Sequence, residues 1–254
     1  MSGHSKWAQI KRQKGVADVR RGQAFTKLAN AITIAVRQNG GIGDPAQNFK
    51  LRLAVEKARE ANMPKENIQR AIEKGMGKGK GEEFAEVQYE GYGPAGVAII
   101  VEAATDNKLR TNGEVKNTFD KNGGNLGTPG AVSYMFQQKG MVTVGKNGKS
   151  VDDVFLIAAD AGAEDVEEAG EEIIIYTKPE ELAKVRDAIA KELSVTSAEL
   201  TRKPVVTVPI QTPEQVKQIL SFTEKLEALD DVQKVYANFD IPEHLIDMQL
   251  TQSI

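Results

Sequence analysis

The side chains with the clearest chemical character are the cations of the first 27 residues, which recur every few positions with Asp18 as their single acidic neighbour. Lysine and arginine at this density neutralise a phosphate backbone and release its counterions, which gives a salt-dependent affinity. The single tryptophan lies among them and could stack on a base or anchor the segment to a helical core. The candidate contacts in this segment are Lys6, Trp7, Lys11, Arg12, Lys14, Arg20, Arg21 and Lys27.

A second group of cations follows, beginning with Lys50 and Arg52 and continuing with Lys57 and Arg59. Their spacing places them along one predicted helix, where they extend the positive surface. No array of base-reading side chains accompanies them. The pattern therefore predicts binding to a nucleic-acid backbone, with no sequence preference that can be derived.

The charge of the chain is divided unevenly. Residues 1–80 carry 17 Lys and Arg against 6 Asp and Glu, a net charge of +11, and the remainder carries 16 against 30, a net charge of −14. One interpretation is a lysine-rich helical surface that is simply solvated. The size of the separation favours a polyanionic partner for the basic end.

Two glycine patterns resemble phosphate-binding loops. Residues 91–96 fit the spacing G-x-G-x-x-G, but a second strand follows instead of a helix N-terminus, and Pro94 lacks an amide hydrogen. Residues 140–147 resemble a Walker A loop, but a β-prone apolar run fills the middle, and Asn147 replaces the hydroxyl that binds magnesium. Both patterns are therefore interpreted as turns next to strands.

The remaining residues contain no pattern typical of a metal site or of a pair of acid–base catalysts. His4 and His244 are the only histidines, they lie at opposite ends of the chain, and there is no cysteine. The acidic residues between 164 and 172 cluster around a predicted hairpin, where a solvated surface is the common role. We expect no catalytic residues, no metal, no cofactor and no enzymatic activity.

Residues 123–130 form a loop with four glycines. The amides around Gly123, Gly124, Asn125 and Gly127 could cradle an anion or contact an RNA or a peptide. The alternative is a tight helix-to-strand connection that needs positive φ angles, and this interpretation is favoured.

The basic segment is predicted to be helical because apolar residues recur there at three- and four-residue spacing. We expect helices over 18–38 and 46–61 and a short third helix from Pro64 to Gly75, joined by glycine-containing turns. Residues 75–81 are rich in glycine and lysine and predict a flexible hinge.

Beyond the hinge, the spacing of apolar residues changes from one typical of helices to one that is mostly typical of strands. We expect strands over 86–92, 96–104 and 131–136 and a helix over 111–121. Residues 140–208 predict a βαββαβ unit of the ferredoxin-like type. Its elements are a strand at 141–144, a helix at 151–161, strands at 163–168 and 172–177, a helix at 179–193 and a strand at 203–208.

The last segments, a helix over 213–229 and a strand over 232–239, are too short to fold alone, so we expect them to return to the sheet that begins at residue 86. The fold class is therefore multidomain α and α+β, with an N-terminal helical bundle and two α+β domains. The second of these is ferredoxin-like and inserted into the first. The expected domains are 1–80, then 81–137 with 209–254, and the insert 138–208.

The chain shows no secretory signal and no apolar run of membrane-spanning length, so we expect a cytoplasmic protein without a membrane partner.

Several segments, in this order along the chain, resemble the YebC family. They are Gly3-His4-Ser5-Lys6-Trp7, residues 21–28 (Arg-Gly-Gln-Ala-Phe-Thr-Lys-Leu), residues 89–94 (Tyr-Glu-Gly-Tyr-Gly-Pro) with Gly96-Val97, Thr105-Asp106-Asn107, and residues 123–127 (Gly-Gly-Asn-Leu-Gly). The resemblance covers essentially the full chain. It implies three domains, one helical and two α+β.

The family is described as DNA-binding transcriptional regulators of the bacterial cytoplasm. It also includes a mitochondrial translational activator, and some members are described as ribosome-associated factors that relieve stalled translation. The resemblance thus implies double-stranded DNA as the partner, or ribosomal RNA in the alternative. The acidic domains would then serve protein contacts or self-association.

Overall fold

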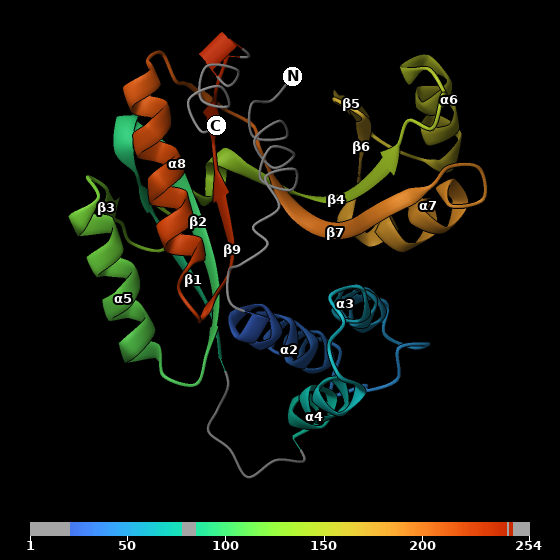
Figure 1. Cartoon of the computed structure of the whole chain (residues 1–254), viewed down its shortest axis with the longest axis horizontal. Coiled ribbons are helices and arrows are strands. Elements are labelled where there is room, and N and C mark those ends of the chain that lie inside the picture. The colour runs from blue at the N-terminus through green and yellow to red at the C-terminus, as the bar shows by residue number, and fades with distance from the viewer. Residues whose placement is uncertain (1–20, 78–84, 243, 246–254) are drawn as a thin grey trace. The chain divides into compact units, whose positions relative to one another are not determined.

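The computed structural model describes residues 21–77, 85–242, 244 and 245, so the predicted basic arm and residues 78–81 of the predicted hinge lie outside the described residues. The described chain divides into two compact units (Figure 1). Of the described residues, the helix–sheet unit comprises 21–77, 85–133 and Glu214–Ala237, and the ferredoxin-like unit comprises Tyr134–Pro213, 238–242, 244 and 245. In the described part of the chain, no helix combines the length and apolar character needed to cross a lipid bilayer.

Three helices open the helix–sheet unit: α2 (Arg21–Gln38), α3 (Phe49–Glu60) and α4 (Lys65–Gly75). Their buried apolar residues form one core, as the three- and four-residue spacing predicted. Helix α3 begins three residues later than expected because Asn48 caps it: the side-chain oxygen accepts a hydrogen bond from the Leu51 amide at 3.1 Å. The Asn48 amide group also donates to the carbonyls of Ala35 and Ile42, so this buried side chain joins three segments.

The same unit contains a sheet in the order β3-β1-β2-β9. Its strands are β1 (Ala85–Tyr92), β2 (Ala98–Thr105), β3 (Asn125–Leu126) and β9 (Val232–Ala237). Strand β9 pairs antiparallel with β2, as expected for a segment that returns to the sheet begun near residue 86. The residue limits of the three expected domains stay predictions.

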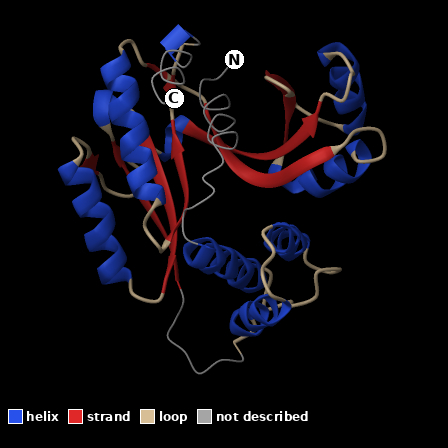
Figure 2. Ribbon diagram, viewed as in Figure 1, coloured by secondary structure: helices blue, strands red, loops and turns tan. Residues whose placement is uncertain are grey.

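Helices α5 (Lys108–Lys121) and α8 (Pro213–Glu227) cover one face of this sheet (Figure 2). They meet through Phe119 and Phe222, whose rings pack edge to face with centroids 5.0 Å apart. The strand end must approach these rings closely: a side chain at Gly91 would lie 2.7 Å from the Phe119 ring, and one at Gly93 would lie 2.8 Å from the Phe222 ring. The first two glycines of the apparent phosphate-binding spacing, Gly91 and Gly93, are therefore required for packing.

The ferredoxin-like unit contains a second sheet in the order β5-β6-β4-β7, antiparallel throughout. Its elements follow the predicted βαββαβ sequence. They are β4 (Phe136–Gly145), α6 (Val151–Ala161), β5 (Asp165–Ala169), β6 (Glu172–Thr177), α7 (Leu182–Ile189) and β7 (Val195–Pro204). Short strands β8 (Val208–Pro209) and β10 (Phe239–Asp240) form a separate parallel pair in this unit.

Two predicted strands were wrong. Residues 131–135 form a connection that ends in a 3-10 turn, Ser133–Met135, and Phe136 begins β4. The buried carboxylate of Glu90 binds the amides of Val132 and Ser133 and so holds this connection away from a strand. The strand expected at 203–208 is instead β7, which ends at Pro204. As an edge strand that pairs only with β4 it is half-buried and mainly polar, so it lacks the apolar alternation of a core strand.

The helix expected at 179–193 is also shorter than predicted. A 3-10 turn, Pro179–Glu181, precedes α7, and α7 ends at Ile189. Pro179 suits the first turn of a helix but gives no information about where that helix stops.

Candidate nucleic-acid interface

Six of the predicted contacts precede the described chain. Lys6, Trp7, Lys11, Arg12, Lys14 and Arg20 lie outside the described residues, and Arg21 opens α2 without a described side chain. Their role as nucleic-acid contacts stays a prediction.

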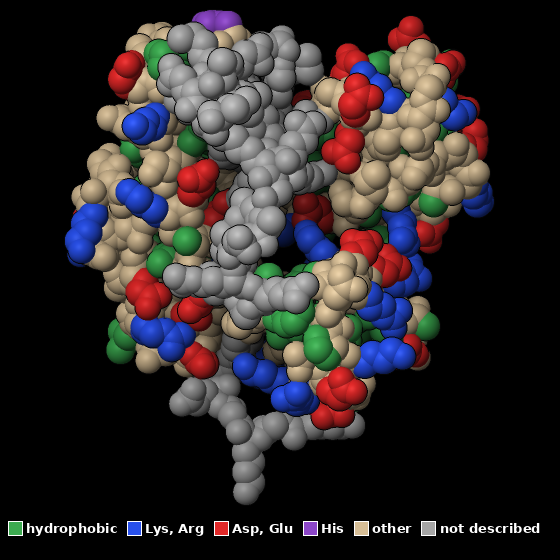
Figure 3. Space-filling model, in the orientation of Figure 1, with side chains coloured by type: hydrophobic (Ala, Val, Ile, Leu, Met, Phe, Trp, Pro, Cys, Tyr) green, Lys and Arg blue, Asp and Glu red, His purple; other side chains and the backbone are tan. Residues whose placement is uncertain are grey.

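The described cations of helix α3 lie on two flanks of that helix. The side chains of Lys50 and Lys57 are exposed on one flank, and Arg52 and the exposed Arg59 lie on the other. Each pair is seven residues apart, which corresponds to about 10 Å along the axis. Figure 3 shows Lys and Arg side chains gathered over the region of α3 and α4.

The two residues of α3 that were predicted to contact nucleic acid, Lys50 and Arg52, both interact with neighbouring side chains. The Lys50 ammonium donates to the Gln38 side-chain oxygen at 2.8 Å, and the Gln38 amide donates to Glu86 at 2.7 Å. The Arg52 guanidinium lies over the Phe49 ring, 5.1 Å from its centroid. Lys50 thus presents its charge at the surface, whereas Arg52 is half-buried and packs on its own helix.

Lys27 has a different environment from the other cations. Its ammonium donates to the carbonyl oxygen of Val232 at 2.7 Å and to that of Glu227. These carbonyls lie at the end of α8 and the start of β9, so Lys27 joins α2 to the turn between them. Its predicted contact with a phosphate would require the ammonium to leave both carbonyls.

We expect the substitution Lys27→Met to lower the free energy of unfolding by about 2 kcal/mol, because two carbonyls lose a charged donor while the apolar stem is kept. Urea unfolding followed by circular dichroism measures the change. The control Lys50→Met removes the same charge from an exposed position and should change stability by about 0.5 kcal/mol or less. Equal losses in the two variants would show that the carbonyl contacts of Lys27 contribute nothing.

The glycine loop connects α5 to the sheet. A side chain at Gly124 would lie 2.9 Å from the Tyr92 carbonyl oxygen, and the Gly127 amide donates to the Glu90 carbonyl at 2.8 Å. Gly123 has a positive φ of 76°. These contacts support the favoured interpretation of a tight connection, while Asn125 remains exposed and the predicted loop contact stays a prediction.

The Glu90 side chain fixes the second half of this connection. Only 4% of Glu90 is exposed, and its carboxylate accepts hydrogen bonds from the amides of Gly130 at 3.0 Å, Val132 at 2.9 Å and Ser133 at 2.8 Å. Burial alone would raise the pKa of Glu90, but these bonds and one from Gln88 outweigh it and lower the pKa. This role could not be predicted from the sequence, because Glu90 resembles an ordinary polar residue of a strand.

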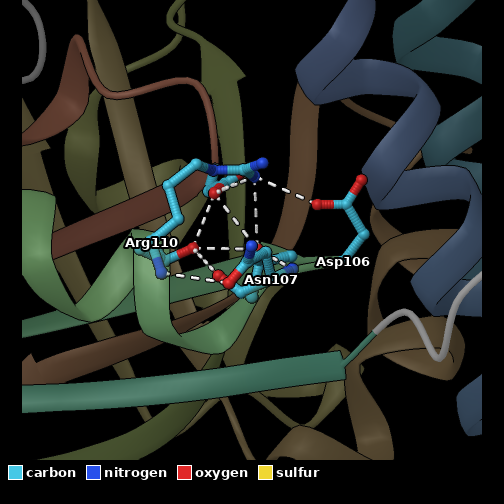
Figure 4. Close-up of polar contacts among 6 residues, drawn as sticks. Asp106, Asn107 and Arg110 are labelled. Carbon is cyan, nitrogen blue, oxygen red and sulfur yellow. Dashed lines mark hydrogen bonds and ion pairs between the residues drawn. The ribbon is translucent and has the colours of Figure 1, made fainter.

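A second polar cluster joins the end of β2 to α5 and β9. The Asp231 carboxylate accepts hydrogen bonds from Thr111 at 2.6 Å, Arg110 at 2.7 Å and Thr105 at 3.1 Å. In Figure 4 the guanidinium of Arg110 also faces Asp106, at 3.1 Å. Burial alone would raise the pKa of Asp231, but the bonds from Arg110, Thr111 and Thr105 lower it.

Asn107 completes this cluster as the cap of α5, since its side-chain oxygen accepts from the Arg110 amide at 3.1 Å. The Thr105-Asp106-Asn107 segment therefore supplies a strand end, an ion-pair partner and a helix cap. Its geometry is that of a structural junction, because both carboxylates accept from Arg110 and Asp231 also accepts from two threonine hydroxyls.

Most of the acidic residues between 164 and 172 belong to β5, β6 and the turn between them, and Glu164 lies directly before β5. Four of their carboxylates form ion pairs with lysines from β4, β7 and the turn after β4: Lys203 with Asp165 at 2.5 Å and Glu167 at 2.8 Å, Lys139 with Glu164 at 2.7 Å, and Lys146 with Glu168 at 2.5 Å. Among the residues that the structure describes, no group of three His, Cys, Asp or Glu side chains is arranged to hold a metal ion.

Two family models cover most of the chain. Residues 5–78 match the TACO1/YebC N-terminal domain, and residues 84–239 match the TACO1/YebC second and third domains. The chain belongs to the TACO1/YebC family. The expected resemblance to YebC proteins is thus confirmed, and the break between the two matches falls beside the predicted hinge at 75–81.

TACO1/YebC relatives match over nearly their whole length. A "Probable transcriptional regulatory protein" of Roseiflexus castenholzii is 54% identical over 250 residues, which are 96% of this chain and 97% of the relative. A similarly named protein of a Sulfurihydrogenibium strain is 50% identical over 97% of this chain and 98% of its own length.

The crystal structure of a conserved hypothetical protein from Aquifex aeolicus has the same fold. It superimposes with a TM-score of 0.81 at 47% identity, covering 89% of this chain and 93% of that one. The mixed α and α+β class expected from the sequence is therefore confirmed.

Proposed function

We propose that this TACO1/YebC protein is a cytoplasmic regulatory protein that binds double-stranded DNA through its basic N-terminal part. The observation that carries the proposal is the separation of charge, +11 within residues 1–80 and −14 beyond them. Exposed lysines on α3 support it, because they present cations to a phosphate backbone. The names of the relatives, probable transcriptional regulatory proteins, support DNA as the partner.

A second candidate uses the same surface on a different polyanion. In this alternative the protein is a ribosome-associated factor that binds ribosomal RNA and relieves stalled translation. The observation that favours it is the family membership, because the YebC family also includes the mitochondrial translational activator named above. Lysines that contact phosphates serve DNA and structured RNA alike.

In both forms of the proposal the chain acts by binding and not by catalysis, and its acidic α+β parts contact protein partners or a second copy. The net charge of −14 beyond residue 80 keeps these parts away from phosphate. Sedimentation velocity measures self-association directly; a single monomeric species at all concentrations would leave only the protein-partner form of this idea.

Charge-removal variants test the interface. We expect the double variant Lys50→Ala, Lys57→Ala to bind a promoter duplex about tenfold more weakly and to reduce the slope of log K against log salt by about 2. The arm variant Lys11→Ala, Arg12→Ala, Lys14→Ala should reduce that slope by about 3. Fluorescence anisotropy at several salt concentrations measures both.

The matched control is Lys184→Ala, Lys191→Ala, which removes two exposed lysines seven residues apart in the ferredoxin-like unit. Its affinity and slope should equal those of the unchanged protein. Unchanged binding by both interface variants would refute the proposal. Co-sedimentation with ribosomes at moderate salt distinguishes the two candidate functions. Absence of the protein from ribosomal fractions would contradict the translation-factor function. Binding to ribosomes without any shift of promoter DNA would contradict the transcriptional-regulator function.

A further inference from the structure

The helical bundle contains a groove of ≈ 290 Å³ between α2 and α4. Its floor is apolar and formed by small or buried side chains, among them Ala29, Met63 and Ala71, with Phe25 at the side. Polar side chains stand around it: Thr26 and Asn30 come from α2, and Asn67, Arg70 and Lys74 come from α4. None of the roles described above uses this groove.

The groove exists because the two helices approach each other closely at one end. A side chain at Gly75 would lie 2.6 Å from the Val36 side chain, and the Thr33 hydroxyl donates to the Ala71 carbonyl at 3.0 Å. At the other end Phe25 and Met63 line an open groove instead of a closed contact. The Thr33 hydroxyl is satisfied within the bundle, because it lies 3.0 Å from the carbonyl oxygens of both Ala29 and Ala71 and can donate its single hydrogen to either. The rest of the floor offers an apolar surface.

The chemistry around the groove fits a flat ring linked to a phosphate. Asparagine carboxamides both donate and accept, which suits the edge of a nucleobase. Arg70 and Lys74 supply positive charge, and Arg70 is positioned by bonds to the Asn67 side chain at 2.8 Å and to the Glu66 carbonyl at 3.3 Å. The volume lies at the lower limit of roughly 300–1,000 Å³ for drug-sized ligands, so a single nucleotide fits better than a longer segment.

We propose that this groove receives one unpaired nucleotide of an otherwise double-helical nucleic acid, with its base on the apolar floor and its phosphate beside Arg70 and Lys74. The proposal rests on the function proposed above, because the same bundle carries the cations of α3. An unpaired nucleotide occurs in a bulged RNA helix and in a distorted DNA duplex. Both present the same groups, an exposed base and its backbone phosphate.

The test uses the full-length protein and fluorescein-labelled short duplexes, in DNA and in RNA form, each with and without one unpaired adenosine. We expect at least one bulged duplex to bind about tenfold more tightly than its paired parent. The type of duplex that shows this preference identifies the source of the nucleotide.

Two groove variants should abolish the preference while keeping the affinity for paired duplexes. Ala29→Met fills the floor, and Asn30→Ala, Asn67→Ala shortens the polar groups; the second keeps the test valid if the first destabilises the bundle. The control Lys65→Ala, Gln69→Ala changes exposed residues of α4 outside the groove and should keep the preference.

Equal binding of bulged and paired duplexes by the unchanged protein would overturn the groove proposal and leave the proposed function intact. Failure to bind any duplex would overturn both. Displacement of the bulged duplex by an acidic peptide, lost in the groove variants but not in the control, would assign the groove to a peptide instead.

Discussion

Replacing Glu90 with alanine is expected to lower the free energy of unfolding of the helix–sheet unit by about 4 kcal/mol. The substitution leaves the buried amide of Val132 and the partly buried amides of Gly130 and Ser133 without their acceptor. A fully buried unsatisfied amide costs about 1–3 kcal/mol, and a partly buried one costs less. Urea unfolding measured at neutral pH gives the change. Because these amides lie in the connection that follows the glycine loop, hydrogen exchange in residues 128–133 should accelerate as well.

The conservative variant Glu90→Gln separates charge from shape, since it keeps one oxygen acceptor. We expect it to lose about 2 kcal/mol at pH 7. The folded protein lowers the pKa of Glu90, so the stability that its charge provides is present above the unfolded-state pKa and is lost as pH falls through the folded-state pKa.

The difference between the unchanged protein and Glu90→Gln should therefore shrink as pH falls from 7 toward 3. A difference that stays constant over this range would show that the charge of Glu90 contributes nothing. The control is Glu86→Gln, because Glu86 is exposed and lies four residues before Glu90 on the same face of β1. This variant should change the free energy of unfolding little.

Regular elements with a periodic apolar pattern could be predicted from the sequence. The helices and strands with such a pattern, α2, α4, α6, β1, β2 and β6, lie within a few residues of their predicted limits. The predicted order of the ferredoxin-like unit was also correct, because alternating strand and helix signals have few compatible topologies.

Single polar residues with distant partners could not be predicted. Asn48, Glu90 and Asp231 are buried, and Asp231 bonds residues of β2 and α5 that precede it by more than a hundred positions. A one-dimensional pattern contains no information about such pairs. Each looks like an ordinary surface residue until the fold is known.

The candidate interface also combines features that could be predicted from the sequence with features that depend on packing. Charge counting found the cations of α3, because net charge is a property of composition. It could not separate Lys50, whose ammonium lies at the surface, from Lys27, whose ammonium binds two backbone carbonyls. The groove between α2 and α4 was missed entirely, since Asn30, Asn67, Arg70 and Lys74 come together only when the helices pack.

The second large effect is expected at Asp231. The variant Asp231→Ala should lower the free energy of unfolding by about 3 kcal/mol, because it removes the acceptor that Thr105, Thr111 and Arg110 share and leaves the buried Thr105 hydroxyl without one. Thr111 can still donate to the Asn107 carbonyl, and Arg110 can still donate to Asp106. The loss should affect the contact between α5 and the start of β9 first, which hydrogen exchange in α5 can locate.

The chain contains its own matched control for this prediction. Asp106 also pairs with Arg110, at 3.1 Å, but both side chains are about 45% exposed there, whereas the Asp231 side chain is 13% exposed. An exposed ion pair contributes about 1 kcal/mol or less, so Asp106→Ala should be nearly neutral. Arg110→Met removes the shared partner of both carboxylates and should fall between the two aspartate variants, because the threonine hydroxyls still bind Asp231.

The dependence on pH gives an independent test of the same junction. Since its bonds lower the pKa of Asp231, the contribution of this carboxylate is present above its unfolded-state pKa and disappears as pH falls through its folded-state value. The stability gap between the unchanged protein and Asp231→Ala should therefore narrow in acid, while the gap to Asp106→Ala stays small throughout. Equal losses for Asp106→Ala and Asp231→Ala at neutral pH would contradict the assignment, because burial is the property that distinguishes the two carboxylates.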